Sequence, residues 1–588
     1  MSVEKLIVDH METWTSALQT RSTAGRGSSG KIDLYGIKKL RELILELAVR
    51  GKLVPQDPND EPASELLKRI AAEKAELVKQ GKIKKQKPLP EISEEEKPFE
   101  LPEGWEWVTF SHLGYFFGGK TPSKMKDEYW GGTIPWVTPK DMKTNLIVDS
   151  EDKVTPLALE DGLTKVSPGS ILFVARSGIL RRIFPVAITS IECTVNQDIK
   201  VLSPFFSDIS YYILLMMNGF ERYIIENLTK TGTTVESLLF EDFISHPFMI
   251  PPFAEQNRIL STVKKLMSLC DQLEQQSLTT LDAHQQLVET LLGTLTDSQN
   301  AEELAENWAR ISEHFDTLFT TEASVDALKQ TILQLAVMGK LVPQDPNDEP
   351  ASELLKRIAQ KKAQLVKEGK IKKQKPLPPI SDEEKPFELP EGWEWCRLGS
   401  IYNFLNGYAF KSEWFTSVGL RLLRNANIAH GVTNWKDVVH IPNDMISDFE
   451  NYILSENDIV ISLDRPIINT GLKYAIISKS DLPCLLLQRV AKFKNYANTV
   501  SNSFLTIWLQ SYFFINSIDP GRSNGVPHIS TKQLEMTLFP LLPQSEQDRI
   551  ISKTDELIQT CNKLKYIIKT AKQTQLHLAD ALTDAAIN

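Results

Sequence analysis

The chain has 588 residues, of which 41% are hydrophobic and 24% are charged, a composition that excludes disordered and collagen-like proteins. At about 150 residues per domain, the length predicts several folding units. The 66 basic and 76 acidic residues give a net charge of −10, so the chain is not basic throughout and any contact with nucleic acid has to be local.

The five cysteines lie far apart without a CxxC pair, and the nine histidines are scattered. This spacing supports neither a disulfide framework nor a zinc site, and we expect no metal ion on the chain. The apolar stretches are much shorter than the roughly 18 residues that a membrane span needs. We therefore expect a cytoplasmic protein.

A long internal repeat divides the chain into two halves. The segment GKLVPQDPNDEPASELLKRIA at residues 51–71 recurs letter for letter at residues 339–359. Over residues 51–107 and 339–395 the two copies agree at 51 of 57 positions without a gap. Such self-similarity indicates a duplicated architecture.

Each half is predicted to begin with two helices. In the first half an apolar stripe at residues 37–47 closes at Gly51, and a second helix lies between Asp60 and Gly81. The same signals return 288 positions later. The run ELPEGWEW that follows, at residues 100–107 in the first copy, could stack on bases, but because both copies are identical we favour a packed start of the next domain.

Two different inserts follow the shared segments, at residues 108–252 and 396–543. Both are rich in β-branched and aromatic residues with Gly and Pro punctuation, which predicts domains that contain strands. They do not resemble each other by eye, and their net charges are −3 and +2. Identical scaffolds that carry different inserts predict one kind of task performed on two different targets.

A long helix is predicted after each insert. Both helices begin with a Pro-x-x-Glu-Gln-x-Arg-Ile signature, at residues 252–259 and 543–550, and continue with apolar residues at alternating spacings of four and three. About 39 helical residues would extend roughly 58 Å. We expect these helices to pack on each other, and not on their own domains, through Ile259, Leu266, Cys270, Leu273, Leu287, Leu291, Ile550, Leu557, Cys561, Leu564, Leu578 and Leu582.

The sequence contains no recognisable catalytic motif. Residues 250–253, Ile-Pro-Pro-Phe, resemble the (Asn/Asp)-Pro-Pro-(Tyr/Phe) motif of amino methyltransferases, but Ile250 cannot hydrogen-bond a target amine. No GxxxxGK[ST] loop is present, and no GxGxxG follows a predicted strand, to hold ATP or a dinucleotide. We therefore expect a non-catalytic chain without catalytic residues or a cofactor of its own.

Several motifs together carry a family resemblance. They are the two-copy plan, the scaffold sequence ELAVRGKLVPQ at residues 46–56 and the first residues of each insert. The inserts begin with GGKTPS (118–123) and YWGGTIPW (129–136), and with GYAFKS (407–412) and RLLRN (421–425). With these motifs the chain resembles, over essentially its whole length, the specificity subunit of a type I restriction-modification enzyme.

The resemblance implies an α+β fold with two globular target recognition domains of mixed α/β structure. Two long antiparallel helices, a coiled coil, would join these domains in an internal pseudo-two-fold repeat. We accordingly expect an N-terminal helical region and a central helical region that repeats it, each followed by a recognition domain and a spacer helix. In chain order these segments are residues 1–104, 105–252, 253–297, 298–392, 393–543 and 544–588.

The resemblance also implies a DNA sequence-recognition subunit in which each recognition domain reads one half of a bipartite asymmetric site. The helices would fix the spacer between the half-sites in double-stranded DNA. The implied partners are two modification (methyltransferase) subunits, which methylate adenine N6 with S-adenosylmethionine, and restriction (translocase and nuclease) subunits, which use ATP and magnesium. These cofactors would belong to the partners.

Candidate DNA contacts are side chains that can reach base edges or phosphates. Arg and Lys suit guanine, Asn and Gln suit adenine, and Ser and Thr suit phosphates. A surface salt bridge or a loop hydrogen bond is the alternative role for each candidate. The candidates are Lys120, Thr121, Ser123, Lys124, Lys126, Arg176, Arg181, Arg182, Lys411, Ser412, Arg424, Asn425, Asn427, Arg465, Arg522 and Asn524.

Two other functions remain open on the sequence. One is a coiled-coil adaptor that holds proteins and does not bind DNA, which suits the acidic scaffold. The other is a self-contained DNA methyltransferase or nuclease, which requires a cofactor site that the sequence does not display. Exchange of residues 108–252 for another insert discriminates a DNA-recognition subunit from an adaptor, because only the former predicts a changed half-site. Failure of the purified chain to bind S-adenosylmethionine or ATP would exclude the self-contained enzyme.

Overall fold

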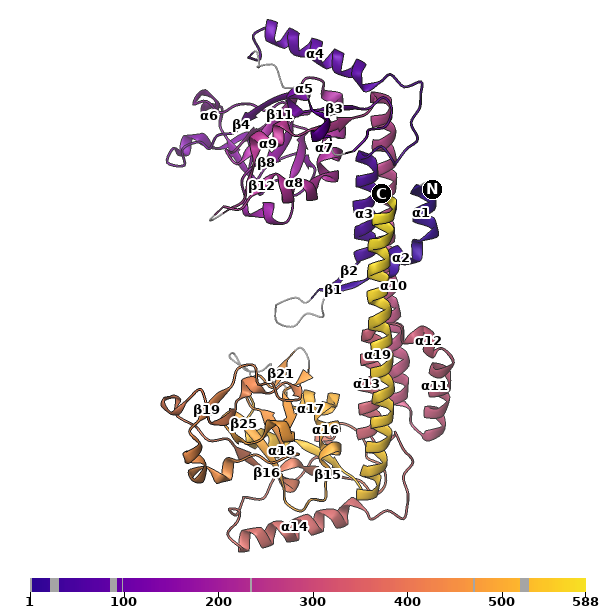
Figure 1. The fold of residues 1–588 in the computed structure, drawn as a ribbon. Helices are drawn as coiled ribbons and strands as arrows, with labels where there is room; N and C mark the ends of the chain where they lie inside the picture. Colours follow the sequence, from indigo (N-terminus) through magenta and orange to yellow (C-terminus); the bar gives the residue numbers. More distant parts are fainter. Residues whose placement is uncertain are drawn as a thin grey trace. The chain divides into compact units, whose positions relative to one another are not determined.

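The computed structural model describes residues 3–21, 31–84, 92–97, 99–232, 235–468, 471–518 and 528–587. The chain divides into two compact units (Figure 1), the first built mainly from residues 29–279 and the second from residues 280–571. The N-terminal segment and the residues from 572 onward belong to the first unit. Within the described ranges, no helix combines the length and apolar character that crossing a membrane requires.

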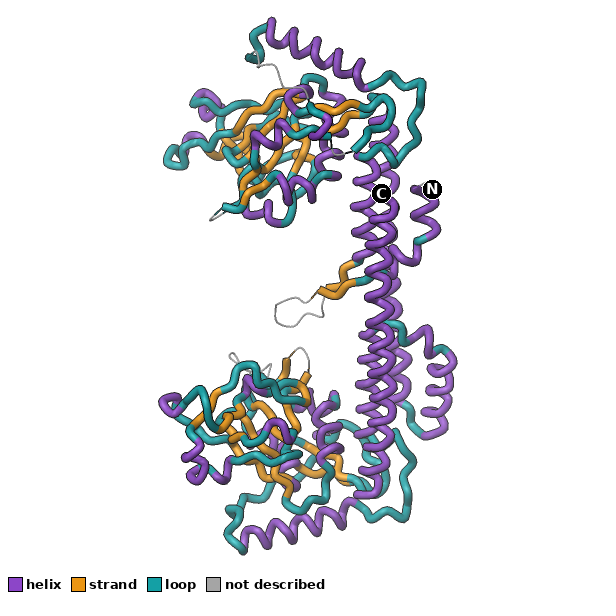
Figure 2. Tube along the Cα trace, in the orientation of Figure 1, coloured by secondary structure: helices purple, strands orange, loops and turns teal. Residues whose placement is uncertain are grey.

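The first unit carries a recognition domain of mixed helices and strands (Figure 2). Helices α3 (Tyr35–Val49) and α4 (Ala63–Lys79) precede it. Its five-stranded sheet has the order β4-β11-β8-β9-β6, and a second sheet has the order β10-β5-β7. In chain order the strands are β4 (Gly114–Gly118), β5 (Trp130–Val137), β6 (Leu146–Ile147), β7 (Asp152–Val154), β8 (Ile171–Val174), β9 (Val186–Thr189), β10 (Thr194–Val195) and β11 (Ile199–Pro204).

The second unit has the corresponding parts. Helices α13 (Glu322–Val337) and α14 (Ala351–Lys367) precede a five-stranded sheet of order β16-β25-β20-β23-β18 and a second sheet of order β19-β17-β24. The strands are β16 (Tyr402–Asn406), β17 (Leu420–Leu423), β18 (His430–Gly431), β19 (Val439–Ile441), β20 (Ile459–Ser462), β23 (Tyr474–Ile476), β24 (Cys484–Leu486) and β25 (Val490–Asn495).

The two recognition domains share one strand topology although their sequences do not resemble each other by eye. Each strand of the five-stranded and three-stranded sheets of the first domain has a counterpart in the second, in the same sheet position and the same chain order. The parallel pairs match as well, because β5 with β10 corresponds to β17 with β24, and β6 with β9 corresponds to β18 with β23. The predicted α+β class with an internal repeat is confirmed.

Each domain joins its scaffold through one tryptophan and one glutamate. In the first unit Trp105 Nε1 donates to Glu255 Oε2 (3.0 Å), and Gln56 Nε2 donates to Glu255 Oε1 (3.1 Å). Burial raises the pKa of Glu255, and the two donated hydrogen bonds oppose this shift. The second unit repeats the arrangement with Trp393, Gln344 and Glu546. The ELPEGWEW run is therefore a packed start of each domain, as predicted.

A conservative substitution tests how much the hydrogen bonds at this junction contribute to the free energy of unfolding. Glu255→Gln keeps one acceptor oxygen but places an amide NH₂ against one of the two donors, Trp105 Nε1 or Gln56 Nε2. We therefore expect the free energy of unfolding to fall by about 1–3 kcal/mol. Glu546→Gln is expected to have the same effect in the second unit. Urea unfolding of the full chain measures both variants, and Glu289→Gln on the exposed helix surface serves as the control. Unchanged stability in both junction variants would contradict this account.

The two long helices, α10 (Phe253–Asp297) and α19 (Gln544–Ile587), each contribute to both units. In the first unit Arg41 of α3 forms an ion pair with Asp271 (2.7 Å), whereas Gln56, farther along the chain, reaches Glu255. Later residues of the chain, from Arg41 to Gln56, thus contact earlier residues of α10, from Asp271 to Glu255. Helix α10 therefore runs antiparallel to α3.

Helix α19 runs in the opposite direction to α10. In the first unit Tyr35 donates to Asp580 (2.6 Å), and Lys52 donates to the carbonyl of Ile587 (2.6 Å), so α19 runs parallel to α3. In the second unit α19 runs antiparallel to α13, because the contacts of Asp326 and Lys329 lie at successively earlier α19 residues, Lys565 and Asn562. The roles of α10 and α19 are thus exchanged between the units, which is the predicted pseudo-two-fold repeat.

The apolar stripe of each long helix differs from the prediction at one position. Leu287 and Leu578 are 51% and 42% exposed, whereas their neighbours Val288 and Ala579 are buried. The prediction followed a strict heptad, but a straight helix of 3.6 residues per turn drifts by about 20° per heptad. Of the other predicted positions, Ile259, Leu266, Cys270, Ile550 and Cys561 are buried, and partly buried ones are Leu273, Leu291, Leu557, Leu564 and Leu582.

Candidate nucleic-acid interface

Three loops meet at one edge of the five-stranded sheet in the first recognition domain. Strand β11 lies between β4 and β8 and pairs antiparallel with both, so β4 and β8 end where β11 begins. The loops at this edge are residues 119–126, 175–182 and 196–198. We call these residues the recognition edge of the domain.

The recognition edge holds all eight candidates of the first insert. Backbone hydrogen bonds tie its loops together, because Lys120 N donates to Val195 O (3.1 Å) and Arg176 N donates to Asp198 O (3.3 Å). Five candidates follow β4 and three follow β8: Lys120, Thr121, Ser123, Lys124, Lys126, Arg176, Arg181 and Arg182.

Some of these side chains are held by neighbours. Lys120 Nζ donates to the carbonyl of Asp161 (2.8 Å). Lys126 Nζ donates to the hydroxyl of Tyr129 (2.7 Å) and lies 4.7 Å from the centre of its ring. This hydrogen bond raises the pKa of Lys126, which therefore stays protonated at neutral pH. The ammonium groups of Lys120 and Lys126 are therefore held in place by hydrogen bonds to neighbouring residues.

Other basic side chains on this edge are free. Within the ranges given above, Lys124, Arg176 and Arg182 are exposed and form neither a side-chain hydrogen bond nor an ion pair. Arg181 is 62% exposed and pairs with Glu236, whose side chain is only 5% exposed. The free cations can bind phosphate or guanine, and the buried carboxylate fixes the direction of Arg181.

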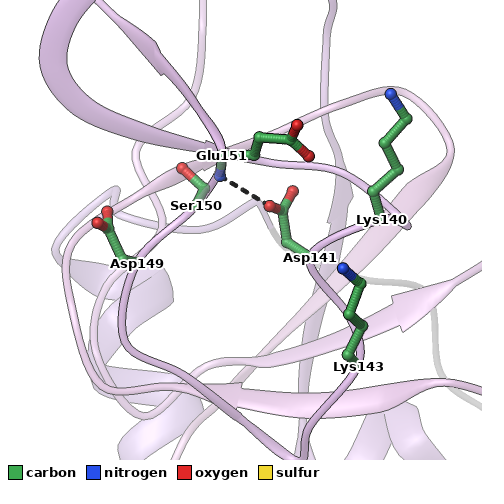
Figure 3. Close-up of a pocket in the computed structure, with 6 residues that line it drawn as sticks. All are labelled: Lys140, Asp141, Lys143, Asp149, Ser150 and Glu151. Carbon is green, nitrogen blue, oxygen red and sulfur yellow. Dashed lines mark hydrogen bonds between the residues drawn. The ribbon is translucent and has the colours of Figure 1, made fainter.

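A polar hollow lies in the loops that follow β5 and β6 (Figure 3). The carboxylate of Asp141 accepts hydrogen bonds from the backbone nitrogens of Thr138 (2.7 Å) and Glu151 (2.8 Å), and so joins two loops. Because backbone donors occupy this carboxylate and both charge signs are present, we assign the hollow a structural role. Its lining residues are Lys140, Asp141, Lys143, Asp149, Ser150 and Glu151.

The second recognition domain has the equivalent edge. Strands β16 and β20 end where β25 begins, so their loops meet there. The recognition edge of this domain is residues 407–416, 463–468 and 487–489. Lys411, Ser412 and Arg465 lie on this edge and are exposed.

The side chains of the candidates Arg424 and Asn427 are engaged within the domain, which disfavours their predicted contact with DNA. Asn427 is 1% exposed, and its Nδ2 donates to the carbonyls of Asn434 (3.0 Å) and Asp437 (2.8 Å). Arg424 donates to the carbonyl of Asp437 (2.7 Å) and pairs with its carboxylate (2.9 Å). These side chains close the turn that follows β17, because a polar turn satisfies its own buried groups first.

Of the remaining candidates of the second insert, one is described by the structure and two are not. Asn425 lies in the same turn, is partly exposed, and its carbonyl accepts from Lys473. Arg522 and Asn524 lie outside the described residues.

The candidate contacts chosen from the sequence leave out three exposed side chains on the recognition edges, Gln197, Gln488 and Arg489. The resembled family often has Thr-Asn-Gln near this strand, and residues 194–197, Thr-Val-Asn-Gln, are close to that pattern, whereas residues 487–489 are Leu-Gln-Arg. Arg489 is 60% exposed and pairs with Asp464 at 3.3 Å. Besides this pattern, the place of all three residues, one or two positions before a buried strand, is a signal. A position before a strand predicts a loop. It does not predict which other loops lie beside that loop in the folded domain.

Metal-ligating side chains and thiols were compared over the described residues. These residues contain no group of three or more His, Cys, Asp and Glu side chains that could hold a metal ion. All five cysteines are buried and free. Burial raises the pKa of Cys193 and of Cys270 to about 11, so these thiols stay protonated and unreactive at neutral pH.

The model of the family described as type I restriction modification DNA specificity domain matches the chain twice, over residues 102–283 and 390–572. The EcoAI specificity subunit of a type I restriction enzyme from Escherichia coli is 76% identical over 601 residues, which cover 100% of both chains. The EcoEI specificity subunit from Escherichia coli is 48% identical over 606 residues, again 100% of both chains.

Among solved structures, the chain is similar to the HsdS subunit from Thermoanaerobacter tengcongensis, with 16% identity and a TM-score of 0.38 over 83% of this chain and 98% of that one. Each family match contains one recognition domain and the first part of the long helix that follows it. The resemblance predicted from the motifs is confirmed. The chain belongs to the specificity subunits of type I restriction-modification enzymes, the non-catalytic component that recognises the DNA sequence.

Proposed function

We propose that each recognition domain reads one half of a bipartite asymmetric site through its recognition edge. One observation carries the proposal: in two domains of unlike sequence, the same topology gathers exposed cations and amides at the same sheet edge. Such a set can bind phosphates and base edges together. Different side chains on equivalent edges account for two different half-sites.

The affinity of the isolated chain is expected to be modest. The two inserts have net charges of only −3 and +2, and the whole chain has −10. Phosphate neutralisation therefore rests on a few local cations, and partner subunits would add binding surface.

Removing the free cations of the first domain tests the proposed interface. The triple variant Lys124→Ala, Arg176→Ala and Arg182→Ala is expected to weaken DNA binding and to lower the slope of log affinity against log salt by about 3, because about one counterion is released per phosphate contact. The measurement is a fluorescence-anisotropy titration of the full complex at several salt concentrations.

A matched control carries the same loss of charge elsewhere. Lys264 and Lys265 on α10 and Arg310 on α11 (Ala301–Glu313) are exposed and lie outside both recognition edges and the near-identical scaffold segments. Their replacement by Ala is expected to leave the slope unchanged. Equal salt slopes for the edge variant and the wild type would refute the proposed interface.

We propose that the chain works in the cytoplasm with two modification subunits and with restriction subunits. The near-identical scaffold segments, residues 51–107 and 339–395, support two equal docking surfaces for the modification subunit. S-adenosylmethionine, ATP and magnesium would act on the partners, and the chain itself would hold no cofactor. An adaptor that ignores DNA would give no methylated motif when chain and modification partner are expressed together.

We also propose that the six segments predicted from the sequence are the structural regions of the chain, namely two helical regions, two recognition domains and two spacer helices. The ends of α10 and α19 support the limits set for the two spacer helices. The closing strand pairs support the limits of the recognition domains: β3 (Glu106–Val108) with β14 (Phe248–Ile250), and β15 (Glu394–Arg397) with β26 (Leu538–Leu541).

A further inference from the structure

The position two residues before strand β11 of the first domain is fixed by backbone hydrogen bonds. Gly119 N donates to Ile199 O (3.4 Å), and Asn196 N donates to Val137 O (3.0 Å). Between these bonds lies Gln197, two residues before Ile199, with its side chain exposed. The sheet therefore determines where Gln197 stands on the recognition edge.

The second domain repeats these hydrogen bonds with different residues. Gly407 N donates to Val490 O (2.9 Å), and Leu487 N donates to Leu423 O (3.1 Å). Between them lies Gln488, again exposed and again two residues before the strand. Gln197 and Gln488 are thus structurally equivalent.

The neighbours of the two glutamines are unlike. Asn196 and Asp198 flank the first, whereas Leu487 and Arg489 flank the second. A side chain that is the same in two domains with different targets is expected to serve what both targets share. In double-stranded DNA the shared part is the phosphodiester backbone, which carries no sequence information.

The hydrogen bonding of Gln197 favours a phosphate over a base. The hydroxyl of Thr121 donates to Gln197 Oε1, so the carbonyl end is engaged by the protein and the NH₂ end remains for a ligand. Adenine recognition by Gln requires both ends, because adenine presents a donor and an acceptor together. A phosphate oxygen requires only a donor.

We propose that Gln197 and Gln488 each donate an amide hydrogen bond to a DNA phosphate and so set the register of their recognition domains on the two half-sites. The proposal rests on the proposed function. Nearby side chains that differ between the edges, such as Arg176 and Arg465, would read the bases or neutralise other phosphates.

The test uses the chain assembled with its modification subunits and a duplex carrying the site obtained by mapping methylated adenines. Gln197→Ala and Gln488→Ala are each expected to weaken binding about 10-fold, both on this duplex and on duplexes with single base changes in a half-site. The salt slope is expected to stay unchanged, because a neutral amide releases no counterion. Gln275→Ala, on the exposed surface of α10, is the control and is expected to bind as the wild type does.

A second variant separates phosphate binding from a structural role. Gln197→Glu keeps the acceptor for Thr121 but replaces the donor by a negative charge, so it is expected to bind DNA more weakly than Gln197→Ala. Better binding by Gln197→Glu than by Gln197→Ala would show a structural role and overturn the proposal. Losses below about 2-fold in both Ala variants, or an altered base preference, would also overturn it. A wild-type complex without any sequence preference would instead refute the proposed function before a variant is measured.

Discussion

A chain in which residues 398–537 replace residues 109–247 is expected to recognise an inverted repeat of one half-site in place of two different half-sites. The replacement keeps the closing strand pairs β3 with β14 and β15 with β26. Both domains have the same strand order, and both scaffolds anchor a tryptophan on a buried glutamate, so the transplanted domain should fold in its new place. Because α10 and α19 exchange roles between the two units, we expect the two equal half-sites to form an inverted repeat.

Mapping of methylated adenines in DNA from cells that express the variant with the modification partner measures this outcome. The reciprocal replacement is the matched control and should give an inverted repeat of the other half-site. If the first half-site persisted in the mapped motif, residues outside the exchanged segment would read it, and the assignment of the recognition edges would be wrong. The proteins' unfolding transitions report separately whether each exchanged chain is folded.

Inserting seven residues into both long helices is expected to lengthen the preferred spacer by about 3 base pairs and to leave both half-sites unchanged. Seven residues add about 10.5 Å to a helix, and base pairs are about 3.4 Å apart along the axis. The insertion points are between Thr279 and Thr280 and between Ala571 and Lys572, where the two compact units divide. Seven residues make two turns to within about 20°, so the apolar stripes continue across the insert.

Insertion into only one helix is the control for this experiment. Each unit packs part of α10 against part of α19, so a single insertion displaces one stripe relative to the other. We expect this variant to lose stability and DNA recognition instead of changing the spacer. Binding to duplexes with spacers of graded length measures both variants. A change of half-site sequence after the double insertion would contradict a spacing role for the helices.

Features that depend on residues close together in the chain were predicted more accurately than features that depend on distant residues. Neighbouring residues set the helix stripe at residues 37–47, its end at Gly51 and the two long helices. The structure confirms these helices as α3, α10 and α19. Gly51 adopts a φ of 68°, which glycine tolerates at a helix end. The stripe failed only at Leu287 and Leu578, where drift accumulates over many turns.

Candidate contacts were harder to predict because a side chain's chemistry does not reveal its partners. Arg182 and Arg424 look alike in the sequence, yet one is free and exposed and the other is held by Asp437. Gln197 and Gln488 stand in segments that do not align by eye, and only backbone hydrogen bonds to distant residues reveal their equivalence.

The duplication, the order of helices and inserts, the long apolar helices and the family can all be recognised in the residues alone. Local spacing and repeated residues encode all of these. The three-dimensional fold was needed to show that two unlike inserts share one topology and that loops far apart in the chain meet at one sheet edge. It was also needed to show which cations of those loops remain free. Strand pairing between distant segments and the burial of turn residues depend on contacts that no local pattern specifies.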